Sequence, residues 1–199
     1  NIVLDHPGSK DASDLQAAIR LGLRPYADAE VFRSSDTDSN QVEGATVAWT
    51  LKAEPQTSVR IAWSTWNAEF RAPRLGSEID TRAQALSASV TSRVVAPITF
   101  HARLGAVRED TFDGGSRTVG TLGGFMRFQV GPRFLVGTDG GRDVLVDTAP
   151  LIDRGIRVDE ANGRVEFRYR PPWLLSGSAG VASYSDGNAR RPAGEALEW

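Results

Sequence analysis

The feature that most constrains this fold is a long, repeated alternation of apolar and polar residues. In residues 98–106, every second residue from Ile98 to Ala106 is apolar, and the residues between them include His101 and Arg103. The same alternation recurs in residues 45–53, 59–66, 119–130 and 164–169. Because successive side chains of a strand point to opposite faces of a sheet, this pattern predicts strands with one apolar and one polar face.

The connections between these segments indicate how the strands follow one another. Short connections carry Pro55, Pro97, Pro132 and Pro171, and proline favours a turn because it cannot donate to a strand ladder. They alternate with longer polar connections at residues 34–42, 67–81, 108–116, 140–155 and from 186 onward. Short turns at one end and long loops at the other are typical of outer-membrane barrels. We therefore predict an all-β, antiparallel up-and-down barrel of outer-membrane type, localised in a bacterial outer membrane.

About nine to ten strands are expected within a single domain, or barrel fragment, that covers residues 1–199, with residues 1–23 as a lead-in. Single-chain bacterial barrels have even strand numbers, so a count of nine predicts a missed strand or a missing piece. The expected strands are residues 24–33, 43–53, 58–68, 82–95, 98–108, 117–130, 133–144, 156–170 and 173–184.

The direction of the apolar face distinguishes two fold classes that share this pattern. A soluble β-sandwich turns the apolar face inward, whereas a membrane barrel turns it toward lipid. Most expected strands reach the roughly 9–11 residues that cross a bilayer at a tilt, which favours the membrane barrel. Two alternatives stay open: a soluble sandwich or barrel that binds a ligand through its long loops, and a structural envelope component whose strands complete another chain's sheet.

Composition argues against several kinds of chemistry. The chain has no cysteine, two histidines and a formal net charge of -2, so neither a thiolate site nor a basic nucleic-acid surface is expected. No His-x-His or Glu-x-x-His spacing indicates a metal, and no serine lies in a Gly-x-Ser-x-Gly motif. Residues 36–40 are acidic but lack the glycine and glutamate of a calcium loop. We expect no enzymatic activity, no metal and no cofactor.

The C-terminal third carries a more specific pattern. It contains Arg170-Pro171-Pro172-Trp173-Leu174 and Tyr184-Ser185-Asp186-Gly187-Asn188-Ala189-Arg190-Arg191, preceded by Gly141-Arg142-Asp143-Val144-Leu145. This stretch resembles the C-terminal barrels of outer-membrane proteins with tetratricopeptide arms that export exopolysaccharides such as cellulose or poly-N-acetylglucosamine. The resemblance implies a passive pore for a polar polymer. The chain shows no helical repeat of about 34 residues, and the family's barrel is larger, so we expect only part of a barrel here.

A pore for a sugar polymer or a small polar solute needs hydrogen-bonding groups and aromatic surfaces along its lumen. The polar faces of the expected strands supply both kinds of side chain. The expected partners are membrane lipid, a polysaccharide or small polar solute, and other envelope subunits that complete the barrel, with no nucleic acid. The candidate lumen residues are Arg60, Trp66, His101, Arg103, Phe125, Arg127, Arg164 and Arg168.

Overall fold

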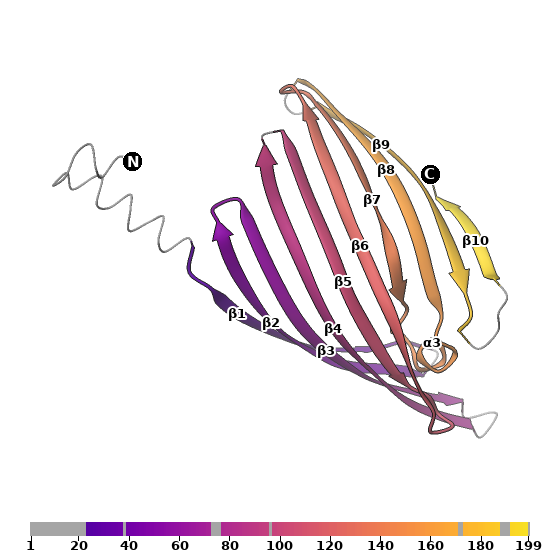
Figure 1. The fold of residues 1–199 in the computed structure, drawn as a ribbon. Coiled ribbons are helices and arrows are strands. Elements are labelled where there is room, and N and C mark those ends of the chain that lie inside the picture. The colour runs from indigo at the N-terminus through magenta and orange to yellow at the C-terminus, as the bar shows by residue number, and fades with distance from the viewer. Residues whose placement is uncertain are drawn as a thin grey trace.

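The computed structural model describes residues 23–37, 39–72, 77–95, 97–170, 173–187 and 192–198, so most of the predicted lead-in lies outside the described residues. These residues form a ten-stranded antiparallel sheet in which the strands are ordered as they are in the sequence (Figure 1). The sheet curves into an open trough (Figure 1). Its strands are β1 (Tyr26–Ser35), β2 (Asn40–Glu54), β3 (Thr57–Ala72), β4 (Ser77–Val95), β5 (Ile98–Asp110), β6 (Ser116–Val130), β7 (Phe134–Val144), β8 (Arg157–Arg170), β9 (Trp173–Ser185) and β10 (Pro192–Glu198).

Each of the nine predicted strands corresponds to one of β1 to β9, and β10 is an additional strand that pairs with β9. The main difference between the predicted and the observed strands lies at one end of the sheet, where long loops were expected. We call this end of the sheet the loop end. The predicted loop at residues 67–81 is wrong for most of its length, because β3 continues to Ala72 and β4 begins at Ser77. Charged residues such as Glu69 and Glu78 gave this segment the composition of a loop, but its backbone continues the ladder between the two strands.

The two faces of the sheet differ sharply in polarity. On the outer face, large apolar side chains lie uncovered: Leu104 is 68% exposed, Met126 52% and Trp49 50%. The inner face, on the opposite side of the same strands, carries residues such as Arg103 and Phe125. Other exposed apolar residues of the outer face are Val31, Val47, Ile61, Trp63, Leu86, Leu122, Phe128, Val136, Val165, Phe167, Leu175 and Val181.

The outer apolar residues form a belt of limited height, which we call the apolar band. It covers residues 98–106 of β5, 120–130 of β6 and 173–181 of β9, close to the roughly 9–11 residues that a tilted strand needs to cross a bilayer. Toward the loop end the outer positions become polar or charged on β2 to β6 and on β8, and on β7 at Arg142. The first such charged positions include Glu43, Arg82, Arg108, Arg142 and Asp159.

The inner face becomes apolar at the loop end, where a short helix covers it. Helix α3 (Ala149–Arg154) lies between β7 and β8 in the sequence, and it packs against β2 to β5. Its C-terminus is closed by Gly155, whose left-handed backbone (φ 64°) lets its N–H reach the Leu151 and Ile152 carbonyls. The core between the helix and the sheet consists of Val42, Ala68, Ala83, Val107, Val119, Val144, Ala149 and Ile152. None of the helices among the described residues is long and apolar enough to span a membrane.

Candidate functional site

The candidate site has two parts, the polar inner wall of the trough and the mouth that α3 covers at the loop end. On the first part of the wall, Arg60 of β3 donates two hydrogen bonds to the Asp28 carboxylate of β1, both at 2.7 Å. The two side chains meet across β2, where Ala48 pairs with Asp28 and is small and buried. A partly exposed bidentate pair therefore fixes the Arg60 guanidinium on the inner wall.

The middle of the wall combines aromatic and charged groups from β5, β6 and β7. The His101 ring stacks on Phe125 with centroids 5.3 Å apart, and the Arg127 guanidinium lies 4.8 Å from the centre of the Phe125 ring. The His101 Nδ1 atom shares a hydrogen bond of 2.8 Å with the Thr91 hydroxyl. Arg103 pairs with the Asp143 carboxylate. These contacts hold both rings and two guanidinium groups against the wall.

A shallow depression of about 200 Å³ opens beside these groups. Glycines of β6 and β7 line its floor, and a side chain at Gly141 would place its Cβ 2.5 Å from the Leu122 carbonyl oxygen. The close approach of backbone therefore requires glycine at this position. The side chains around the depression are His101, Arg103, Phe125, Asp139, Asp143 and Glu160.

The last part of the wall lies on β8. Arg164 pairs with Glu166 at 2.8 Å, and Arg168 is exposed. The structure places all the sequence-predicted lumen residues on the inner face. Trp66 differs from the others because it is partly buried and packs against the core beneath α3 instead of lining the open wall. The wall as a whole carries charges of both signs, since Arg60, Arg103 and Arg164 each face a carboxylate.

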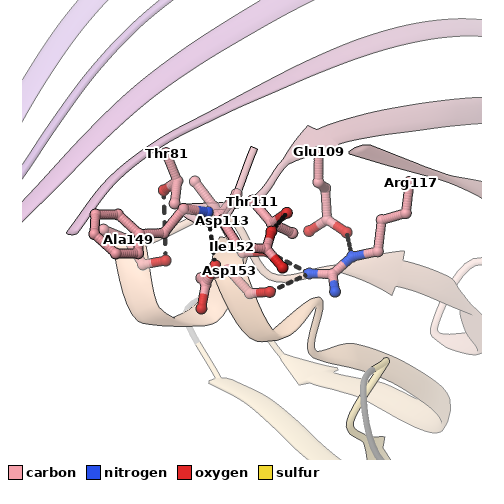
Figure 2. A network of polar contacts seen from close by, with 9 residues as sticks. Thr81, Glu109, Thr111, Asp113, Arg117, Ala149, Ile152 and Asp153 are labelled. Atoms are coloured by element: carbon pink, nitrogen blue, oxygen red, sulfur yellow. Dashed lines mark hydrogen bonds and ion pairs between the residues drawn. The ribbon is translucent and has the colours of Figure 1, made fainter. Parts of the chain in front are cut away.

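The contacts that fasten α3 to the wall were missed by sequence reasoning (Figure 2). Arg117 of β6 donates from Nε to a Glu109 carboxylate oxygen at 2.6 Å. Its other end donates to the Ile152 carbonyl and, at 2.9 Å, to the Asp153 carbonyl. The last carbonyls of a helix have no N–H partner from a following turn; here the Arg117 side chain from the sheet donates to the Asp153 carbonyl and adds to the Gly155 N–H at the Ile152 carbonyl. We call Glu109, Arg117 and these two carbonyls the Arg117 clamp.

Further hydrogen bonds hold the same segment from other directions. The Thr81 hydroxyl donates to the Ala149 carbonyl at 3.4 Å (Figure 2). The Phe112 N–H donates to the Asp153 carboxylate at 2.9 Å. On the far side, Arg154 donates to Asp186 at 2.6 Å and 2.9 Å. The segment that carries α3 is thus attached to several strands rather than projecting from the sheet.

Glu109 is the one buried carboxylate of the clamp, with no exposed surface. It lies beyond the apolar band, because its outward-facing neighbours Arg108 and Asp110 are charged. Burial raises the pKa of the Glu109 carboxyl above its ordinary value, and the hydrogen bond and charge of Arg117 oppose this effect. One oxygen of the carboxylate has no hydrogen-bond partner among the described residues. Burial of the Glu109 carboxyl in the clamp therefore costs desolvation free energy.

No group of three or more metal-ligating side chains is found within the described ranges. No protein-family model and no curated protein matches the sequence. Among solved structures, the chain is similar to the FrpB iron transporter from Neisseria meningitidis in its F3-3 variant, with a TM-score of 0.58 and 9% identity. It is also similar to the apoprotein form of the F5-1 variant, with a TM-score of 0.56 and 8% identity.

Both similarities cover 80% of this chain but only 33% and 34% of the FrpB chains, so this chain spans about one third of their length. They show the fold: an antiparallel sheet of the kind that forms outer-membrane β-barrels, as the sequence predicts.

Proposed function

We propose that this chain forms part of the wall of an outer-membrane β-barrel and that the barrel is a passive conduit for a polar solute. The observation that carries this proposal is the apolar band on the outer face, with its charged border at the loop end. Soluble monomers rarely expose apolar patches larger than a few hundred Å². Lipid contact removes the cost of exposing Trp49, Leu104 and Met126 to water.

Barrel closure is part of the proposal, because a sheet cannot keep open edges in the hydrocarbon region. In the described part of the chain the sheet runs from β1 to β10, and the ladder between these two edge strands is not formed. We therefore propose that further strands, from the same protein or from other envelope subunits, pair with both edges. The length of the FrpB chains supports a barrel larger than the one this chain could form alone.

The side chains of the inner wall favour a solute that has many hydrogen-bonding groups and little net charge. Arginines paired with carboxylates offer donors and acceptors side by side, and single contacts of this kind on an exposed surface are weak. Weak contacts let a solute move along the wall. An exopolysaccharide is a more specific candidate, supported by the stacked His101 and Phe125 rings beside these charged groups.

The test reconstitutes the full-length protein into lipid vesicles, with variants that each retain a single tryptophan. Trp49 and Trp63 lie exposed in the band, whereas Trp66 lies on the inner face against the core. Quenchers attached to lipid chains should reduce the fluorescence of the variants that retain Trp49 or Trp63. The variant that retains Trp66 is the matched control and should be little affected. Equal quenching of all three by a water-soluble quencher alone would refute membrane contact.

The conduit itself is tested in the same vesicles by the entry of uncharged sugars of increasing size, followed as vesicle swelling. Small sugars should enter faster than they enter vesicles without protein. If membrane contact is demonstrated and entry equals that of empty vesicles, the structural role in the envelope is favoured over transport. If the protein stays soluble without detergent, the soluble binding module is favoured.

A further inference from the structure

From the position of α3, we infer that this helix narrows the conduit at the loop end and sets the size of solute that can pass, and that Arg117 is the residue that positions it. This inference rests on the proposed conduit and adds a specificity-determining element to it. The first observation is topological. The segment leaves β7 and returns to β8, but α3 contacts β2, β3, β4 and β5 on the inner face. To reach those strands it must cross the space that the trough encloses.

The second observation is that α3 is packed as part of the core. Ala149 and Ile152 have no exposed surface. They contact a floor of small apolar side chains from β2 to β6, which includes Ala68, Ala83 and Val107. A surface loop that only connects two strands would not need such a floor. The small apolar side chains of the inner face at this height leave room for the helix to pack. The packed helix therefore occupies part of the cross-section of the conduit.

The third observation is the way in which Arg117 determines the position of the helix. Its guanidinium joins the buried Glu109 carboxylate of the wall to the C-terminal carbonyls of α3. Removing the guanidinium takes away the hydrogen bond and the larger counter-charge of the buried Glu109 carboxylate, leaving it the charge of Arg157, and removes both bonds to the helix. The helix then keeps its apolar contacts but loses its polar attachment to β6. We expect the released segment to swing out of the lumen, toward the solvent beyond the loop end, more often than in the unmodified protein and so to widen the mouth.

The experiment compares the unmodified protein with Arg117→Leu in the vesicle-swelling assay, using uncharged sugars and polyethylene glycols of graded size. In the variant, the largest solute that enters should shift to a larger size, while the entry of the smallest sugars changes little. Arg117→Lys should restore part of the original size limit, because an ammonium group can still donate to a carbonyl. The matched control is Arg108→Leu, which removes an exposed arginine from the outer side of β5 beside the clamp.

Trp66 packs against the core under α3, so its fluorescence in a single-tryptophan background reports whether the helix has moved. Should Arg117→Leu fail to fold, Ile152→Ala loosens the helix by removing core contacts of the Ile152 side chain, and it leaves the Glu109 and Arg117 side chains and the backbone carbonyls of the clamp in place. If Trp66 shows that the helix is released and the size limit stays the same, the inference is wrong and the conduit stands. If the unmodified protein admits no solute at all, the conduit itself fails.

Discussion

A single charge placed in the apolar band tests the orientation of the sheet most directly. Met126 lies on β6, whose band covers residues 120–130. At about 3.3 Å per residue, this segment is about 33 Å long, and a tilt of about 45° gives a height of about 23 Å. Outer-membrane barrels have an apolar belt about 25 Å tall. Met126 is then about 9 Å inside the border near Val130 and about 14 Å inside the border near Gly120.

This depth sets the expected effect of Met126→Arg. An arginine on the lipid face costs about 2–4 kcal/mol at the midplane and about 0–1 kcal/mol near the interfaces. We expect Met126→Arg to lower the free energy of unfolding by about 2–3 kcal/mol, because its position is close to the middle. Thr118→Arg is the matched control on the same strand and face. Thr118 lies two residues beyond the band toward the loop end, so we expect a loss of at most about 1 kcal/mol.

The free energy of unfolding can be measured for the full-length protein in lipid vesicles by denaturant titration, with the folded fraction followed by gel mobility without heating. The soluble alternative makes a different prediction. Met126 is already half exposed, and surface substitutions in water usually change stability by no more than about 0.5 kcal/mol. Equal and small effects of Met126→Arg and Thr118→Arg would therefore refute the inverted orientation on which the conduit depends.

Two further predictions concern the inner wall and the mouth. Gly141→Ala should disturb the pairing of β6 with β7 and lower the folded fraction, because the new Cβ would lie 2.5 Å from the Leu122 carbonyl oxygen; Gly120→Ala, which meets nothing within 4 Å, should be tolerated. Glu109 has a raised folded-state pKa, so its contribution to stability is greatest at low pH and is lost as pH rises from the ordinary carboxyl value through the raised one. Glu109→Gln should remove this pH dependence and leave the mouth at least as stable near neutral pH, since glutamine can still accept a hydrogen bond from Arg117. Trp66 fluorescence during unfolding, measured between about pH 4 and about pH 8, checks both points. A loss of stability of the mouth on acidification would contradict them.

The strands could be predicted from sequence because the alternation persists through each of them. On β5, for example, apolar residues recur at every second position from Ile98 to Ala106, and the structure places this whole set on one face. A tenth strand was within the expected number, but its location was not predicted, because Pro192 begins it after a polar connection and the segment looked like a tail. The lengths of β3 and β4 were underestimated because charges replace apolar residues beyond the band.

The position of α3 could not be predicted, because nothing local in residues 149–154 indicates which strands the helix will contact. Val107 and Val119 look like irregularities in a polar face when they are read along their own strands. Glu109 and Arg117 look like an ordinary pair of charges near a hairpin turn. Only the fold shows that the helix packs on Val107 and Val119 and that Arg117 joins Glu109 to the end of the helix.

The polarity of both faces changes at the same height, and this coincidence constrains the class of protein more than either change alone. On β5 the outward residues pass from Leu104 and Ala106 to Arg108, while the inward residues pass from Arg103 to Val107. A soluble sandwich keeps its apolar face on one side along the whole strand, because its core lies on that side throughout. A crossover is expected where a strand leaves lipid and enters a region in which water surrounds the outer face and a packed loop covers the inner face. The loop end of this sheet has both properties, so in the proposed barrel the height of the crossover would mark the membrane border and place the α3 mouth just outside it.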